Sequence, residues 1–165
     1  MQIYVAFGLP GSGKTFIGKI FKKHFGYHFY DGDHDLPDEM KQAIQNHAKV
    51  TNIMRGTFFR AIIKSVKKLE TKYDKIIIAQ TFIKEKYRNE FLYEFPKAKF
   101  ILIQTDIATQ EARLAQRGSD PLHLEYLRKM CSNFDKPRVN YQIINNNIEG
   151  EEKVEEQIQR ILNVK

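Results

Sequence analysis

The sequence has few of the features that mark secreted or membrane proteins. It contains a single cysteine, Cys131, so no disulfide can form within the chain. No window approaches the roughly 20 apolar residues that a membrane-spanning helix requires. The apolar run at the N-terminus has no basic leader and no small-residue cleavage site, which argues against a signal peptide. These absences predict a cytoplasmic protein with no membrane partner.

Basic residues are in excess, but they are not gathered into blocks. The formal net charge is +7, which favours anionic partners, either nucleic acid or a nucleotide together with an acidic small molecule. No run of five or six basic residues occurs, and no pattern of interleaved aromatic and basic residues suggests a groove for single strands. We therefore expect the lysines to solvate helix faces, and we expect no nucleic-acid partner.

The best-defined motif is Gly8–Thr15, GLPGSGKT, which fits the P-loop pattern of Gly, four residues, Gly, Lys and Ser/Thr. Its glycines let the backbone turn tightly and direct N–H groups into a cavity at the start of the next helix, where a polyphosphate can bind. Lys14 would reach the β- and γ-phosphates, and the Thr15 hydroxyl would bind Mg²⁺. The motif thus predicts ATP and Mg²⁺ as cofactors. The residues expected to bind the nucleotide are Gly8, Gly11, Ser12, Gly13, Lys14 and Thr15.

Strand-like runs alternate with helical patterns along the chain. Short apolar runs occur at residues 3–7, 28–30, 75–80, 100–104 and 141–144. Between them, apolar residues recur at helical spacing in 17–25, 58–69 and 154–162, and Asp106 is a candidate N-cap for a helix that ends near Arg117. This alternation predicts a single α/β domain, a three-layer P-loop NTPase fold with a five-stranded parallel sheet and helices on both faces. Ligands are expected at the carboxyl ends of the strands.

Three carboxylates follow the second predicted strand, in Tyr30–Asp35 (YDGDHD). A loop at that edge of the sheet would face the P-loop. One aspartate could hold Mg²⁺ through its bound waters, and another could accept the proton of a substrate hydroxyl, as carboxylates do in phosphoryl-transfer enzymes.

Two other interpretations of these carboxylates remain open. The stretch could be an acidic turn, with Asp35 capping a helix that begins after Leu36 and Pro37. Alternatively, His28 and His34 could form a zinc site with the aspartates, although the usual cysteine or His-x-x-x-His spacing is absent.

The motifs together resemble those of a known enzyme family. The P-loop, the Asp31–Asp33 element, the segment 79–88 (AQTFIKEKYR) and the segment 105–137 are similar to the gluconate kinases and, more distantly, to the shikimate kinases. The resemblance implies ATP-dependent phosphotransfer to a hydroxyl group. It also implies a small helical lid over residues 113–125 and an acceptor-binding region over residues 31–60.

The resemblance assigns roles to residues by position. It implies that Asp31 lies near Mg²⁺ and that Asp33 binds the acceptor hydroxyl and acts as base. Arg55, Lys84 and Arg88 would bind the acceptor. In the lid, Arg113 would stack on adenine, and Arg117, beside a Gly118–Ser119 hinge, would reach the transferring phosphate. The planar guanidinium suits such tasks because it pairs with phosphate and carboxylate through two parallel hydrogen bonds.

The sequence departs from the family pattern on the acceptor side. No glycine occurs between Gly32 and Gly56, Met54 precedes Arg55 where the family has aspartate, and Gln80-Thr81 replaces the glycine loop of the shikimate kinases. We therefore expect intact phosphate chemistry with an acceptor that the sequence does not name.

The predicted function is ATP-dependent phosphotransfer to a hydroxyl of a small, anionic metabolite such as a sugar acid. The catalytic residues would be Lys14, Asp33 and Arg117, in a monomer or a homodimer. Two alternatives stay open, a nucleoside monophosphate or polynucleotide 5′-hydroxyl kinase and a regulatory nucleotide-binding protein without phosphotransfer.

Overall fold

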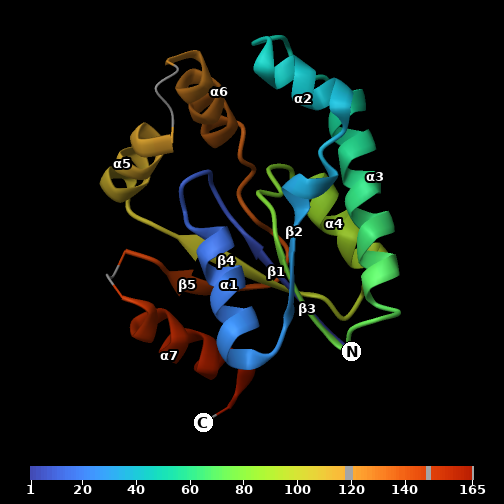
Figure 1. Ribbon diagram of the computed structural model, residues 1–165, viewed down its shortest axis with the longest axis vertical. Helices are drawn as coiled ribbons and strands as arrows, with labels where there is room; N and C mark the ends of the chain where they lie inside the picture. The colour runs from blue at the N-terminus through green and yellow to red at the C-terminus, as the bar shows by residue number, and fades with distance from the viewer. Residues whose placement is uncertain (118–120, 148–149, 165) are drawn as a thin grey trace.

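A five-stranded parallel sheet forms the centre of the computed structural model, which describes residues 1–117, 121–147 and 150–164 (Figure 1). The strands lie in the order β2-β3-β1-β4-β5, and all pairs are parallel. Their bounds are β1 Gln2–Phe7, β2 His28–Asp31, β3 Lys75–Ala79, β4 Lys99–Gln104 and β5 Tyr141–Asn145. The central strands are apolar runs because both of their faces are covered. The predicted sheet is confirmed.

Two helices cover one face of the sheet, α1 (Lys14–Phe25) and α7 (Glu151–Leu162) (Figure 1). Each places a row of apolar side chains against the strands, as the helical spacing predicts. Ile17 and Phe21 of α1 and Ile158 of α7 are completely buried in this layer.

Two other helices cover the opposite face, α3 (Asn52–Leu69) and α4 (Glu85–Glu94) (Figure 1). Phe59, Ile62 and Val66 of α3 and Phe91 of α4 pack in one apolar cluster with the strands. Thr51 caps α3 because its hydroxyl accepts a hydrogen bond from the Met54 backbone N–H at 3.2 Å. The three-layer architecture is thus as predicted.

Short helices lie beyond the carboxyl ends of the strands. They are the 3₁₀ helix η1 (Gly32–Asp35) and the α-helices α2 (Asp38–Gln45), α5 (Ile107–Arg117) and α6 (Pro121–Ser132). In Figure 1, α2 stands on one side of this edge and α5 and α6 on the other. Asp106 caps α5 as predicted, since its carboxylate accepts a hydrogen bond from the Thr109 N–H at 2.7 Å. None of the described helices has the length and apolar character needed to cross a membrane.

Candidate active site

The P-loop connects β1, the central strand, to the start of α1. Gly8 and Gly13 adopt positive φ values of 151° and 93°. A Cβ at Gly8 would lie 2.7 Å from the Ile103 carbonyl oxygen, and one at Gly13 would lie 2.1 Å from Nδ2 of Asn146. At both positions, therefore, only glycine allows the loop to pack this closely against β4 and the segment after β5.

Lys14 reaches back into the loop that precedes it. Its Nζ donates hydrogen bonds to the carbonyl oxygens of Gly8 at 3.1 Å and Leu9 at 3.0 Å. Burial lowers the pKa of Lys14 to about 8, although Asp33 raises it in part. The Ser12 hydroxyl is also buried and has no hydrogen-bond partner among the described residues. A partly buried cation beside a buried hydroxyl without a described partner fits a polyphosphate ligand, which would supply the anionic acceptors that both groups lack.

Thr15, in the first turn of α1, and Asp31, at the end of β2, lie side by side. The Thr15 hydroxyl donates to Oδ2 of Asp31 at 3.4 Å, and Oδ1 of Asp31 accepts a hydrogen bond from the Asp33 backbone N–H at 3.1 Å. The Thr15 hydroxyl and the Asp31 carboxylate are hard oxygen ligands. Two such ligands suit Mg²⁺, because this ion keeps several of its waters when bound. The pair therefore fits the predicted metal.

The zinc alternative is not supported by the geometry. No cluster of three or more His, Cys, Asp or Glu side chains that could hold a metal ion exists among the residues described. The His28 ring instead stacks on Tyr73, with the ring centroids 3.8 Å apart.

The acidic-turn alternative holds for Asp31, which caps η1, but not for Asp35. The Asp35 carboxylate accepts a hydrogen bond from the Tyr30 hydroxyl, and α2 begins only at Asp38. Asp33 has neither role. Its Oδ1 accepts a hydrogen bond from Nε2 of Gln80 at 2.9 Å, which fixes this carboxylate at the end of β3.

One pocket of about 340 Å³ brings most of the predicted catalytic groups together. Lys14, Thr15, Asp31, Asp33 and Arg117 all line it. Arg117, which is exposed at the end of α5, lies near enough to Lys14 to lower its pKa further. The structure therefore places two carboxylates, two cations and the phosphate loop around one space.

Arg113 lies against the P-loop from the side of α5. Its Nη1 donates to the Gly11 carbonyl oxygen at 3.3 Å, and its Nη2 donates to the Asn146 carbonyl oxygen at 3.0 Å. This holds the guanidinium plane beside the loop, on the side of the segment that follows β5. The predicted Gly118–Ser119 hinge lies outside the described residues.

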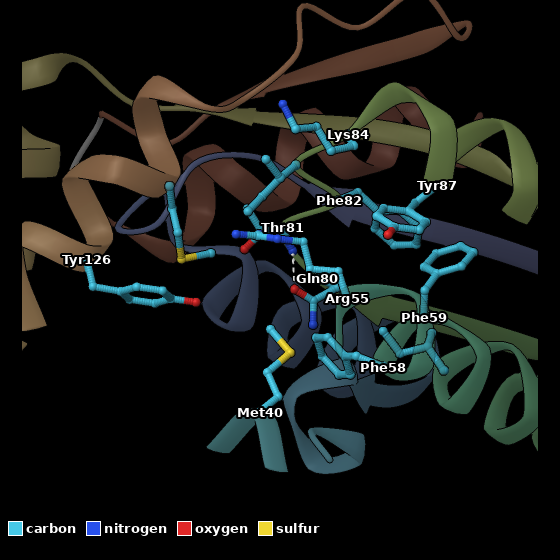
Figure 2. Close-up of a pocket in the computed structure, with 13 residues that line it drawn as sticks. Met40, Arg55, Phe58, Phe59, Gln80, Thr81, Phe82, Lys84, Tyr87 and Tyr126 are labelled. Atoms are coloured by element: carbon cyan, nitrogen blue, oxygen red, sulfur yellow. Dashed lines mark hydrogen bonds between the residues drawn. The ribbon is translucent and has the colours of Figure 1, made fainter. Parts of the chain in front are cut away.

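A second pocket of about 70 Å³, drawn in Figure 2, shares part of its wall with the first. Arg55, half-buried on α3, lines this second pocket, and its side chain forms no hydrogen bond or ion pair with another described residue. Apolar and aromatic side chains make most of its wall: Met40, Phe58, Phe59, Ile62, Phe82, Ile83, Tyr87, Tyr126 and Met130.

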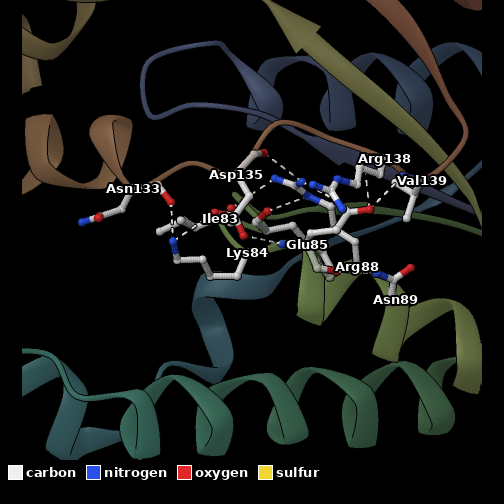
Figure 3. A network of polar contacts seen from close by, with 10 residues as sticks. Ile83, Lys84, Glu85, Arg88, Asn89, Asn133, Asp135, Arg138 and Val139 are labelled. Atoms are coloured by element: carbon white, nitrogen blue, oxygen red, sulfur yellow. Dashed lines mark hydrogen bonds and ion pairs between the residues drawn. The ribbon is translucent and has the colours of Figure 1, made fainter.

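Arg88 does not reach either pocket, contrary to the sequence-based prediction (Figure 3). Its side chain is completely buried and donates to the carbonyl oxygens of Phe82, Ile83 and Asp135, and to Oε2 of Glu85 at 2.7 Å. Its guanidinium also lies over two aromatic rings, Phe7 and Phe134, at 5.1 and 4.7 Å from their centroids. Each of its three side-chain nitrogens donates inside the protein, so Arg88 is a structural residue here.

Lys84 lines the second pocket, called here the apolar pocket, but its ammonium group forms an ion pair within the protein (Figure 3). Its Nζ lies 3.1 Å from Oδ1 of Asp135 and donates to the Asn133 carbonyl oxygen at 2.8 Å. The pKa of Asp135 is lowered by the Glu85 backbone N–H and by Lys84.

Among the site residues that were not foreseen from the sequence, two hold other groups in place. Asn146 follows β5 and is buried. Its Nδ2 donates to the Ser12 carbonyl oxygen at 2.8 Å, which holds the P-loop in place. Gln80 orients Asp33, as described above. Both follow the ends of parallel strands, so their position at the edge of the sheet was a usable signal.

Comparison with known proteins now identifies the family. The sequence profile of shikimate kinase matches residues 10–164. The chain belongs to the shikimate kinase family. A gluconokinase of Arabidopsis thaliana is 27% identical over 149 residues, which cover 81% of this chain and 76% of that protein.

Solved structures agree with this assignment at the level of the fold. A sugar kinase from Janibacter sp. HTCC2649 superposes with a TM-score of 0.78 at 20% identity, covering 99% of this chain and 93% of that chain. A gluconokinase from Sinorhizobium meliloti 1021 gives a TM-score of 0.76 at 18% identity, with 98% and 94% covered. As a member of this family of kinases, the protein is an ATP-dependent kinase with an alcohol group as acceptor, and it acts on a small metabolite.

Proposed function

We propose that the protein phosphorylates a hydroxyl group of a small acid, of which a sugar acid is one example, with Mg²⁺ held by Thr15 and Asp31. The observation that carries this proposal is the position of Asp33. It lies in the same pocket as Lys14 and Arg117, and that pocket shares part of its wall with the one lined by Arg55, whose side chain is not paired with any described residue. A hydroxyl group and an acid group on one molecule would meet complementary side chains there.

The donor side supports this proposal through fixed charge. Bound ATP supplies the phosphoryl group, and Mg²⁺ neutralises charge on its oxygens. Lys14 and the P-loop N–H groups hold the phosphates, and Arg117 lies where it can stabilise charge that develops during transfer. Arg113, beside the loop, is proposed to stack on the adenine. These groups act by position and charge, which is how phosphoryl-transfer enzymes achieve most of their rate.

The acceptor side supports the proposal through one carboxylate and one cation. Asp33 would orient the acceptor hydroxyl and take its proton, while Gln80 keeps the carboxylate in place. Arg55 would pair with the acid group. Lys84 stands at the same pocket and would contribute less, because Asp135 already neutralises it. The regulatory alternative without phosphotransfer loses its support, since the family consists of kinases.

The test is a panel of acceptors in which ADP release is measured with and without each compound. Gluconate, other sugar acids and shikimate form one arm, and neutral nucleosides and 5′-hydroxyl oligonucleotides form the other. We expect stimulation only in the acid arm. Asp33→Asn should abolish it, whereas Asp38→Asn, an exposed aspartate at the start of α2, should not. Stimulation by nucleosides or oligonucleotides alone would overturn the proposal.

A further inference from the structure

We propose that the outer face of α3 is a docking surface for an acidic segment of another protein. This face, called here the basic face, consists of five exposed cations and one apolar side chain: Arg60, Ile63, Lys64, Lys67, Lys68 and Lys72. None of these residues lines the apolar pocket or the pocket that contains the P-loop. The proposal therefore goes beyond the proposed function and does not depend on it.

The charge on α3 is of one sign. Its 18 residues include no aspartate or glutamate, whereas α7 carries four glutamates and pairs Lys153 with Glu156. Arg60, Lys64 and Lys68 follow one another at intervals of four residues, so like charges face each other on successive turns. Such pairs destabilise a helix. An arrangement that lowers the stability of the helix and is not neutralised within it favours an anionic partner from outside.

Most cations of the basic face have no anionic partner in the protein. Lys67 forms an ion pair with Glu94 of α4. The other four form no ion pair with any residue that the structure describes. Arg60 donates to the Thr57 hydroxyl at 3.1 Å, a neutral group that leaves its charge uncompensated. Figure 1 shows α3 on the outside of the molecule with α4 beside it, so a partner can approach the outer face.

The shape of the basic face adds an apolar contact to the charges. A surface hollow of about 560 Å³ lies between the lysines, and Ile63 contributes to its lining. Ile63 is half-buried and packs against the core, so it lies deeper than the exposed lysines around it. Lysine side chains are themselves apolar up to the ammonium group. An apolar side chain flanked by carboxylates would therefore contact the hollow and the surrounding cations together.

A nucleic acid fits this face less well than an acidic protein segment does. None of the described residues that line the hollow is aromatic, so bases would find no surface on which to stack. Glu94 lies beside Lys67 at the border of the face, where its carboxylate would repel a continuous phosphate backbone. In a protein segment, by contrast, the charges are placed one side chain at a time and can avoid Glu94.

A membrane surface also fits less well. An interfacial helix binds a membrane by inserting its apolar face among the lipids. The apolar residues Phe59, Ile62 and Val66 of α3 are packed in the core instead, and Ile63 is half-buried. The basic face therefore offers no apolar stripe that could insert.

A designed peptide tests the proposal. The probe is a fluorescent peptide of about 16 residues that repeats Glu-Glu-Leu-Ala, so that carboxylates and leucines recur about once per helical turn. A second peptide has serine in place of each leucine. Duplex RNA and vesicles rich in phosphatidylserine represent the other two partners. Binding is measured by anisotropy at physiological ionic strength, where mobile ions screen charges beyond about 8 Å.

We expect the leucine peptide to bind with a Kd of about 0.1 mM or tighter. It should bind at least about threefold more tightly than the serine peptide, because the leucines bury apolar surface against Ile63. Absence of binding at about 1 mM peptide would overturn the proposal, as would equal binding of the two peptides. Tighter binding of the RNA or the vesicles than of the leucine peptide would also overturn it.

Two double substitutions of equal charge provide a matched control. Lys64→Glu with Lys68→Glu should weaken binding of the leucine peptide about tenfold or more, because like charges then oppose it. Lys19→Glu with Lys22→Glu changes exposed lysines of α1 and alters the net charge equally, so it should change binding less than about twofold. ATP binding and the melting temperature show that both variants are folded. Equal losses in the two variants would show that the net charge binds the peptide, and the proposal would be wrong.

Discussion

The phosphate loop occupies one short run of the chain, Gly8–Thr15, whereas the pocket beside it takes its walls from α2, α3, α4 and α6. The loop works through backbone groups and a lysine whose positions are set by the turn itself. The apolar pocket works through side chains that are brought together only when the helices pack. The loop therefore specifies a chemistry that many acceptors can share, and the helices decide which acceptor is used. Five predictions follow from this division.

Asp33 lines the pocket that contains the phosphate loop and is proposed to bind the acceptor hydroxyl, so its loss should have the largest effect. Asp33→Asn should reduce phosphotransfer by about 10²- to 10⁴-fold, because the acceptor hydroxyl loses its base, while ATP affinity stays nearly unchanged. Turnover by ADP release and nucleotide binding by calorimetry provide the measurements.

Asp31→Asn is the companion variant of this carboxylate pair. It should instead raise the Mg²⁺ concentration needed for half-maximal rate, because Asp31 contacts Thr15 rather than the acceptor side. If both substitutions had equal and mild effects, the carboxylates would be turn-forming residues only.

Lys14→Ala should lower turnover by about 10²- to 10³-fold, the scale of losing one preorganised group that stabilises developing charge. Its fold should survive, because the hydrogen bonds that the Lys14 side chain makes with described residues go to loop carbonyls and not to the core. Lys19→Ala, an exposed lysine on the same helix, is the matched control. A Lys14→Ala enzyme that turned over at the normal rate would disprove the assignment of the phosphate loop.

Arg55→Ala should weaken acceptor binding and leave ATP binding unchanged. We expect the acceptor KM to rise at least about tenfold, the scale of one lost charged hydrogen bond, with the KM for ATP nearly unchanged. Arg60→Ala, on the exposed side of the same helix, should leave both constants in place. A rise of similar size in the KM for ATP would show that Arg55 acts on nucleotide binding as well as on acceptor binding.

The smallest effect concerns stability and pH. The folded-state pKa of Lys14 is about 8, against 10.5 ordinarily, so the unfolded chain holds more protons than the empty folded protein between these values. The free energy of unfolding contributed by Lys14 should therefore increase as pH rises through this window, by at most about tenfold in the equilibrium constant per pH unit. Denaturation curves of the wild type and Lys14→Met at pH values of about 7, 8.5 and 10 should converge as pH rises. Parallel curves would show that Lys14 is not buried as described.

The sequence predicts the frame well because the frame depends on local patterns. Apolar runs give the strands, and Asp106 marks the start of α5, because capping is a contact between near neighbours. The loop motif locates the nucleotide end for the same reason. Its glycines, Lys14 and Thr15 are adjacent in the chain, so their arrangement needs no tertiary information.

Arg88 shows where prediction from the sequence fails. Its burial depends on Phe7, Phe134 and Asp135, which are distant in the chain and converge only in the folded protein. No spacing rule distinguishes such an arginine from one that binds a substrate. Tyr126 was missed for the same reason, since it becomes a wall of the pocket only when α6 packs above the sheet.

The net charge of +7 already counts the carboxylates that pair with Arg88 and Lys84, so it does not tell where unpaired cations lie. One of these cations is sealed in the interior and the other is matched by a carboxylate, so neither attracts a ligand from a distance. On the acceptor side, the half-buried Arg55 is the cation that no described partner neutralises. At physiological ionic strength, mobile ions screen an exposed charge beyond about 8 Å. An acid should therefore be attracted into this pocket at short range by Arg55, and not by Arg88 or Lys84.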